Sequence, residues 1–158
     1  MGLFSSLFGS NDKGNATRID TSNSLRNFLS NQVETLSREG QSIHINEITI
    51  SYIFHLMMLI TKKPVSISDV RHTMREVFTD QSSRMMIENA IGIFQTDNQT
   101  QEKLAALFPI AKQEFEAGRG EFLIRHTRKA GAAIEAMFEE DNDFDPSKIP
   151  RWTAKDLA

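Results

Sequence analysis

The chain has no cysteine, only four prolines, one tryptophan and one tyrosine among its 158 residues. Without cysteine it can form no disulfide, no thiolate zinc site and no cysteine nucleophile, and this composition agrees with a reducing compartment. The longest apolar stretch, residues 50–60, is far shorter than the about 20 residues that span a bilayer. The N-terminus lacks the basic start and cleavage site of a secretory signal. We therefore expect a cytoplasmic protein without a transmembrane segment.

Catalytic signatures are missing as well. The sequence contains no G-x-S-x-G, no glycine-rich phosphate loop and no H-E-x-x-H. Asp69 and His72 form a D-x-x-H pair, but no second copy completes a di-iron site, so we assign Asp69 to a helix start. We expect a satisfied core histidine at His55, and no cofactor or metal. An enzyme using His55, His72 and His126 remains an alternative, which requires a polar cavity where they converge.

The chain is also short of positive charge, with 18 basic and 21 acidic residues and a net charge of −3. A general nucleic-acid binder needs a basic face, so this class is disfavoured. A local basic stretch exists at 112–129, and a regulatory or nucleic-acid-associated protein that uses it remains an alternative. Its cations are Lys112, Arg119, Arg125, Arg128 and Lys129.

Helical periodicity runs through the middle of the chain, which has the length of one domain. The first predicted helix carries apolar residues at helical spacing from Leu25 to Leu36, and Gly40 follows at a capping position. The next helix is predicted from Asn46, a plausible N-cap, to Lys63, before Pro64. It is apolar on nearly every side, which indicates a buried central helix. A short extended piece is expected at 41–45.

Three further helical segments follow. Ser66 and Asp69 have the spacing of a capping box at the start of the first. Helices at 67–78 and 83–94 resemble a helix-turn-helix, but they carry few cations, so we favour a hairpin of the core. The next segment has an apolar stripe that includes Leu107 and Phe108, and Pro109 should kink or break it.

The last helix is predicted from about residue 118 to Phe138, with no convincing strand pair anywhere. The predicted fold is therefore all-α: a compact bundle of five to six helices around the central helix at 46–63, with extended N- and C-terminal segments. We divide the chain into an apolar N-terminal hook at 1–8, a polar linker at 9–23, one helical domain at 24–138 and an acidic tail at 139–158 that contains proline and tryptophan.

The two terminal segments offer apolar anchors. Leu3, Phe4, Leu7 and Phe8 gather on one side of a short helix. They would hold a membrane only weakly without flanking cations, and the match of Gly2 to a myristoylation start is short, so we favour docking on protein. The acidic tail superficially resembles a calcium loop. Because Pro146 stands where such a loop needs glycine, we expect no calcium site there.

Residues 122–146 begin basic and end acidic, an order that the helix dipole opposes. Two explanations remain open: a solvated helix end, or a strap that folds back over the basic stretch and is anchored by Phe144 and Trp152.

These patterns predict a protein-protein interaction module, such as an adaptor, a chaperone-like protein, or an inhibitory or immunity-type subunit. The expected partner is another protein, and self-association stays open. The predicted partner-binding residues are Leu3, Phe4, Leu7, Phe8, Arg119, Arg125, Arg128, Lys129, Phe144 and Trp152.

Overall fold

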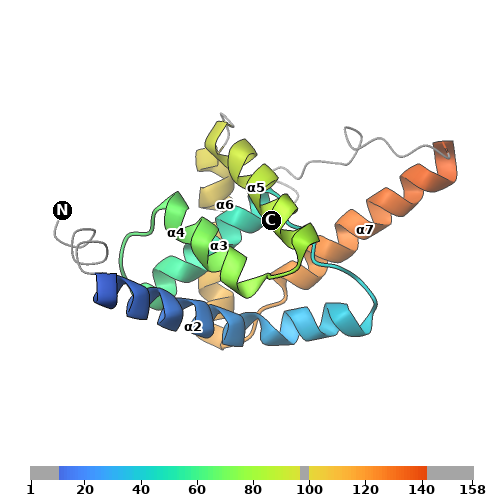
Figure 1. The fold of residues 1–158 in the computed structure, drawn as a ribbon. Helices are drawn as coiled ribbons and strands as arrows, with labels where there is room; N and C mark the ends of the chain where they lie inside the picture. Colours follow the sequence, from blue (N-terminus) through green and yellow to red (C-terminus); the bar gives the residue numbers. More distant parts are fainter. Residues whose placement is uncertain (1–10, 97–99, 142–158) are drawn as a thin grey trace.

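The computed structural model describes residues 11–96 and 100–141, except for the side chains of 11–19, 100, 103 and 133–141. The described residues form helices only, which confirms the all-α prediction, and the helices pack around a shared core (Figure 1). Their bounds are α2 Asn11–Arg38, α3 Glu47–Thr61, α4 Ile67–Val77, α5 Gln81–Thr96, α6 Thr100–Ala117 and α7 Phe122–Asp141.

The central helix is α3, as predicted for residues 46–63. It contacts α2, α4, α5 and α6. Asn46 is its N-cap and forms a capping box with Thr49, so the first backbone N–H groups of the helix are satisfied. Lys62 ends it in the left-handed conformation, with φ of 56°. Most of the helix is buried, from Glu47 to Met57. The helices around α3 supply the rest of the hydrophobic core.

Helix α2 begins earlier than expected, because residues 11–23 of the predicted linker are helical. Thr21 and Ser22 are buried, and the Ser22 hydroxyl donates a hydrogen bond of 2.5 Å to Glu76 of α4. Their small polar side chains suit a close contact between α2 and α4, so tertiary packing overrides the weak helical propensity of the segment. The packed domain therefore includes residues that the sequence assigned to the linker.

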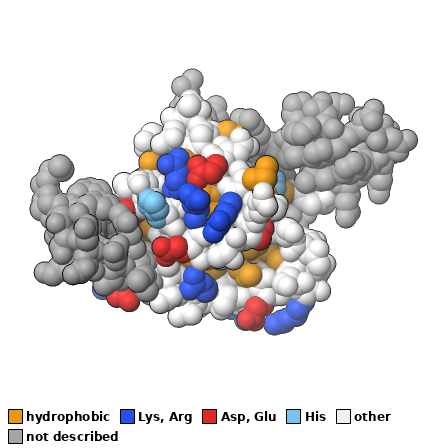
Figure 2. All heavy atoms as spheres, in the orientation of Figure 1, with side chains coloured by type: hydrophobic (Ala, Val, Ile, Leu, Met, Phe, Trp, Pro, Cys, Tyr) orange, Lys and Arg blue, Asp and Glu red, His pale blue; other side chains and the backbone are white. Residues whose placement is uncertain are grey.

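Helices α4 and α5 form the predicted hairpin. The capping box at Ser66 is confirmed, with Ser66 and Asp69 exchanging hydrogen bonds of 3.0 and 3.1 Å. The Nε of Arg71 in α4 lies 3.3 Å from the Oε2 of Glu88 in α5. The face seen in Figure 2 carries basic and acidic side chains beside one another. Since the apolar stripe of α5 is buried, the hairpin belongs to the core.

We expected Pro109 to kink or break this helix, and α6 continues through it without a break. Both Pro109 and Ala105, whose carbonyl loses its hydrogen-bond partner, are exposed. Water can therefore reach the orphaned carbonyl, which lowers the cost of a proline inside a helix.

A buried polar junction joins α2, α3, α6 and the start of α7. The Tyr52 hydroxyl donates to Glu114 over 2.5 Å and accepts from the Gln32 amide over 3.2 Å. The Gln32 carbonyl accepts from the backbone N–H of Leu123 over 2.8 Å. Gly120 packs against this group, where a Cβ would lie 2.3 Å from the Gln32 amide nitrogen. The junction fixes the direction of α7, whose C-terminal half extends away from the other helices (Figure 1).

Candidate interaction surfaces

His55 lies between α3 and α6 as a satisfied core histidine, which confirms that prediction. Its side chain is 9% exposed, and its Nε2 lies 2.6 Å from the carbonyl oxygen of Leu104. A carbonyl only accepts, so Nε2 carries the proton. The ring also contacts the rings of Phe54 and Phe108, at centroid distances of 5.8 and 5.3 Å. Burial lowers the pKa of His55, so the imidazole stays neutral at physiological pH.

Near the buried His55, large apolar side chains reach the surface. Phe108 of α6 is 44% exposed and Met58 of α3 is 37% exposed. Met58 follows the half-buried Phe54 by one helical turn, so both lie on the same side of α3. We call Phe54, Met58 and Phe108 the α3–α6 patch.

Two cations lie at opposite ends of the α3–α6 patch. Lys62 follows Met58 by one turn and Lys112 follows Phe108 by one turn, and both are exposed. Contacts of Tyr52 with Glu114 and of His55 with Leu104 show that α3 and α6 run antiparallel. The patch therefore has an apolar centre and one positive charge at each end.

His126 supports the N-terminus of α3. Its Nε2 lies 3.0 Å from the side-chain oxygen of Asn46, which also accepts from the backbone N–H groups of Ile48 and Thr49. Its ring stacks on Phe122 at 5.5 Å. Burial, with smaller contributions from His44 and Lys129, lowers the pKa of His126 to about 3. Because the neutral imidazole donates a hydrogen bond to the N-cap residue of α3, we assign His126 a structural role.

The histidines of the enzyme alternative do not converge. His126 contacts Asn46, and His55 lies nine residues further along α3, which is about 14 Å of helix. His72 is exposed on α4, beside an Asp69 that is engaged in the capping box. Among the described residues, no three histidine, aspartate or glutamate side chains form a group that could hold a metal ion.

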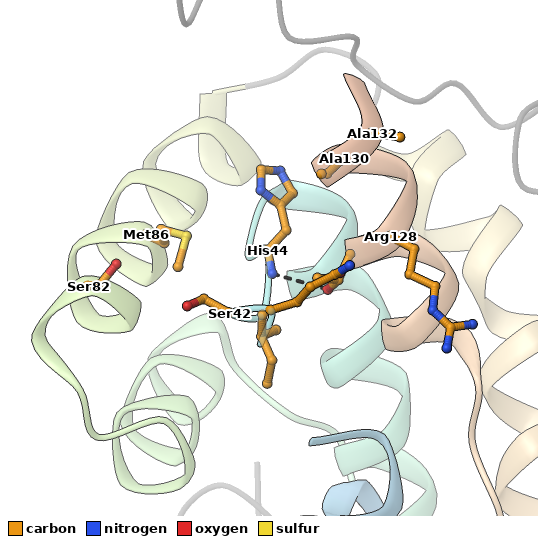
Figure 3. A pocket seen from close by; sticks show the side chains of 11 residues that line it. Ser42, His44, Ser82, Met86, Arg128, Ala130 and Ala132 are labelled. Carbon is orange, nitrogen blue, oxygen red and sulfur yellow. Dashed lines mark hydrogen bonds between the residues drawn. The ribbon is translucent and has the colours of Figure 1, made fainter. Parts of the chain in front are cut away.

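A hollow of about 410 Å³ opens between the 41–44 segment, α5 and α7 (Figure 3). Ser82 and Met86 line it from α5, and Thr127, Ala130 and Gly131 line it from α7. The backbone N–H of His44 donates to the Thr127 hydroxyl over 3.1 Å. That bond holds the connecting segment against α7. We call this space the α5–α7 hollow.

The basic stretch at 112–129 is partly neutralised by glutamates. A guanidinium nitrogen of Arg125 lies 3.6 Å from a carboxylate oxygen of Glu114. Arg128 donates two hydrogen bonds to Glu39 of α2, one of them 3.1 Å long. The hydrogen bond from Arg128 lowers the pKa of Glu39. Arg119 and Lys129 are exposed. The sequence predicted a basic surface from the cations alone. In the fold, glutamates lie beside two of these cations, Arg125 and Arg128.

The remaining predicted partner-binding residues lie outside the described residues: Leu3, Phe4, Leu7, Phe8, Phe144 and Trp152. The length of α7 still constrains the strap hypothesis. Asp141 lies sixteen residues beyond Arg125, about 24 Å along the helix. Three more residues to Phe144 span only about 10 Å. Trp152, with about 37 Å of chain after Asp141, is the anchor that could return to this stretch.

No protein-family model, curated protein or solved structure matches the chain. Within the described ranges, none of the helices has the length and apolar character needed to cross a bilayer. The arguments for function therefore come from the surfaces themselves.

Proposed function

We propose that this chain is a cytoplasmic protein-protein interaction module, and that the α3–α6 patch is its partner-binding surface. The observation that carries the proposal is the exposure of Phe108 and Met58, at 44% and 37%, on two neighbouring helices. Between them, the imidazole of His55 already bonds to Leu104. A partner that covers the patch therefore gains apolar burial, and the N–H of His55 is already paired within the chain.

The composition of the patch indicates the chemistry of the partner. Aromatic side chains supply much of the binding energy at interfaces, and methionine adapts its shape to the opposing surface. Lys62 and Lys112 at the two ends favour acidic side chains at the rim of the partner. We infer that the partner presents an apolar segment flanked by acidic residues. An adaptor, a chaperone-like protein and an inhibitory or immunity-type subunit all fit this chemistry.

The test is recovery of a partner from native cell extract by the tagged full-length protein. We expect one stoichiometric protein with the wild type, and its loss with the double variant Met58→Ser, Phe108→Ser. Met85→Ser is the matched control, because Met85 is 67% exposed on α5, outside the patch. Circular dichroism would confirm that all three proteins are folded. Equal recovery by the double variant and the control would refute this role of the patch.

A further inference from the structure

A second hollow, of about 450 Å³, adjoins the α5–α7 hollow. Residues of α2, of α4 and of the turn before α5 line it, among them Val33 and Asp80. Residues 41–43 line both hollows, and Ser82 of the first is followed along α5 by Ser83 of the second. The two hollows therefore form one groove beside the connection between α2 and α3. We call it the 41–43 groove.

The connection between α2 and α3 offers backbone groups to a ligand in this groove. The N–H and C=O groups of Ser42 and Ile43 have no hydrogen-bond partner among the described residues. The next residue is held in place, because the N–H of His44 donates to the Thr127 hydroxyl and its C=O accepts from the Thr49 hydroxyl. Unpaired backbone groups on a fixed segment can pair with the backbone of an extended peptide.

Apolar side chains lie along both parts of the groove. Met86 of α5 and Ala130 of α7 line the α5–α7 hollow (Figure 3). Val33 and Val77 line the second hollow, and both are half-buried. Ile43 lines both hollows and is half-buried as well. A ligand that follows the groove can therefore bury apolar groups at more than one point along its backbone.

We propose that the 41–43 groove binds an extended peptide, and that this peptide is the chain's own C-terminal segment, residues 142–158. Gly131 of the α5–α7 hollow precedes Asp141, the last residue of α7, by ten residues, which is about 15 Å along the helix. Residues 142–158 span up to about 56 Å when extended. This length is sufficient to return to the hollow and to continue along the groove.

The residues of this segment suit an extended ligand. Pro146 and Pro150 favour a polyproline II conformation, in which three residues make one turn. Pro146, Ile149 and Trp152 would therefore share one apolar side. This conformation has no internal backbone hydrogen bonds, so its N–H and C=O groups can pair with those of the connection.

The charges of the segment and of the groove match in order. The acidic residues of 143–145 come first along the chain, and Arg128 lines the hollow that they reach first. The cations of 148–151 come later, and the exposed Asp80 lines the second hollow. The guanidinium of Arg128 has donors beyond its two bonds to Glu39. None of the lining residues belongs to the α3–α6 patch, so this inference does not rest on the proposed function.

The first experiment uses the fluorescence of Trp152, which is the only tryptophan of the chain. In the full-length wild type we expect emission at a shorter wavelength, and several-fold weaker quenching by acrylamide, than for free tryptophan. Gly131→Leu should restore the emission and quenching of an exposed tryptophan, because the new side chain enters the α5–α7 hollow. Gly92→Leu is the matched control, since Gly92 is also helical and open around a built Cβ but lines neither hollow.

Circular dichroism would confirm that both glycine variants are folded. An exposed Trp152 in the wild type would overturn the proposal without any variant. It would also be overturned by a folded Gly131→Leu protein that keeps the wild-type fluorescence, since the segment would then lie elsewhere.

The second experiment locates the segment with an engineered disulfide, which is selective because the chain has no cysteine. Under mild oxidation at low protein concentration, Ser82→Cys combined with Ile149→Cys should form a disulfide within one chain. Arg84→Cys combined with Ile149→Cys is the control, because Arg84 is exposed on the opposite side of α5, about 160 to 200° round the helix from Ser82 and Met86. We expect several-fold faster closure with Ser82→Cys. Equal rates, or disulfides that join two chains, would contradict the proposal.

Discussion

The buried junction and the α3–α6 patch lie on the same central helix, and they use polar groups in opposite ways. At the junction, Tyr52 bonds to side chains from two other helices, and none of the large exposed apolar side chains in the described part of the chain belongs to it. At the patch, Nε2 of His55 is paired with a backbone carbonyl while Met58 and Phe108 remain exposed. Helix α3 therefore stabilises the fold near Tyr52, and near Met58 it exposes the surface that we propose as the partner-binding site.

The largest effect is expected at Gly120. A Cβ there would lie 2.3 Å from the Gln32 amide nitrogen and 2.8 Å from both the Glu114 carboxylate and the Tyr52 hydroxyl. Gly120→Ala should therefore lower the free energy of unfolding by about 3 kcal/mol or more, because the buried network must shift or break. Urea denaturation measures this change. Gly131→Ala, with open space around its Cβ, should instead be neutral or slightly stabilising. Equal effects at both positions would contradict the packing described for Gly120.

Removing the hydroxyl of Tyr52 tests whether the junction depends on its hydrogen bonds. Tyr52→Phe leaves Glu114 and Gln32 without this partner in a buried site. The expected loss is about 1–3 kcal/mol in the free energy of unfolding. Chemical denaturation at neutral pH would show it. An unchanged stability would mean that the junction relies on shape alone.

Acid should weaken the N-terminus of α3 through His126. Its pKa is about 3 in the folded chain against an ordinary value of 6.5. Between these values the unfolded chain binds a proton that the folded chain does not. The free energy of unfolding therefore falls as pH decreases through this window, by up to about 1.4 kcal/mol per pH unit from this group, and is unaffected by it above the window.

The pH prediction is checked by denaturation from neutral to mildly acidic pH. His126→Gln should reduce the slope of stability against pH, because glutamine does not titrate. His72→Gln is the control, since His72 is exposed on α4. Identical slopes in both variants would show that His126 does not remain neutral in the folded chain.

The smallest change in stability is expected at the patch. Phe108→Ser should cost about 1 kcal/mol or less, because the side chain is already 44% exposed and therefore gives up little buried area. Thermal unfolding measures this change. A loss as large as that predicted for Gly120→Ala would show that Phe108 serves the core. The contrast between the two regions would then disappear.

The sequence predicted the elements whose signals are local. The capping residues Asn46 and Ser66, the apolar character of α3 and the hairpin of α4 and α5 all depend on neighbouring residues, and the structure confirms them. The start of α2 was missed because Ser22 is ordered by a contact with Glu76, 54 residues away. Pro109 was judged without knowing that its turn of helix faces solvent.

The surfaces were less predictable, for the same reason. Phe108 belongs to an apolar stripe in the sequence, and only the position of α6 against α3 shows that it is exposed. Gly120, Gln32 and Glu114 carry no motif, since their roles arise from contacts between helices that are distant in sequence. The glutamates beside Arg125 and Arg128 follow from the same packing. Periodicity predicts which residues share a helix face, but it does not show which faces remain uncovered.

The most direct test of the proposed function is site-specific photo-crosslinking in the native cell. A photoreactive amino acid would replace Phe108 in one full-length protein and Met85 in another, so that two exposed positions are compared. We expect a covalent adduct with one partner protein from position 108 and none from position 85. No adduct from position 108, or the same adducts from both positions, would contradict the assignment of the α3–α6 patch as the partner-binding surface.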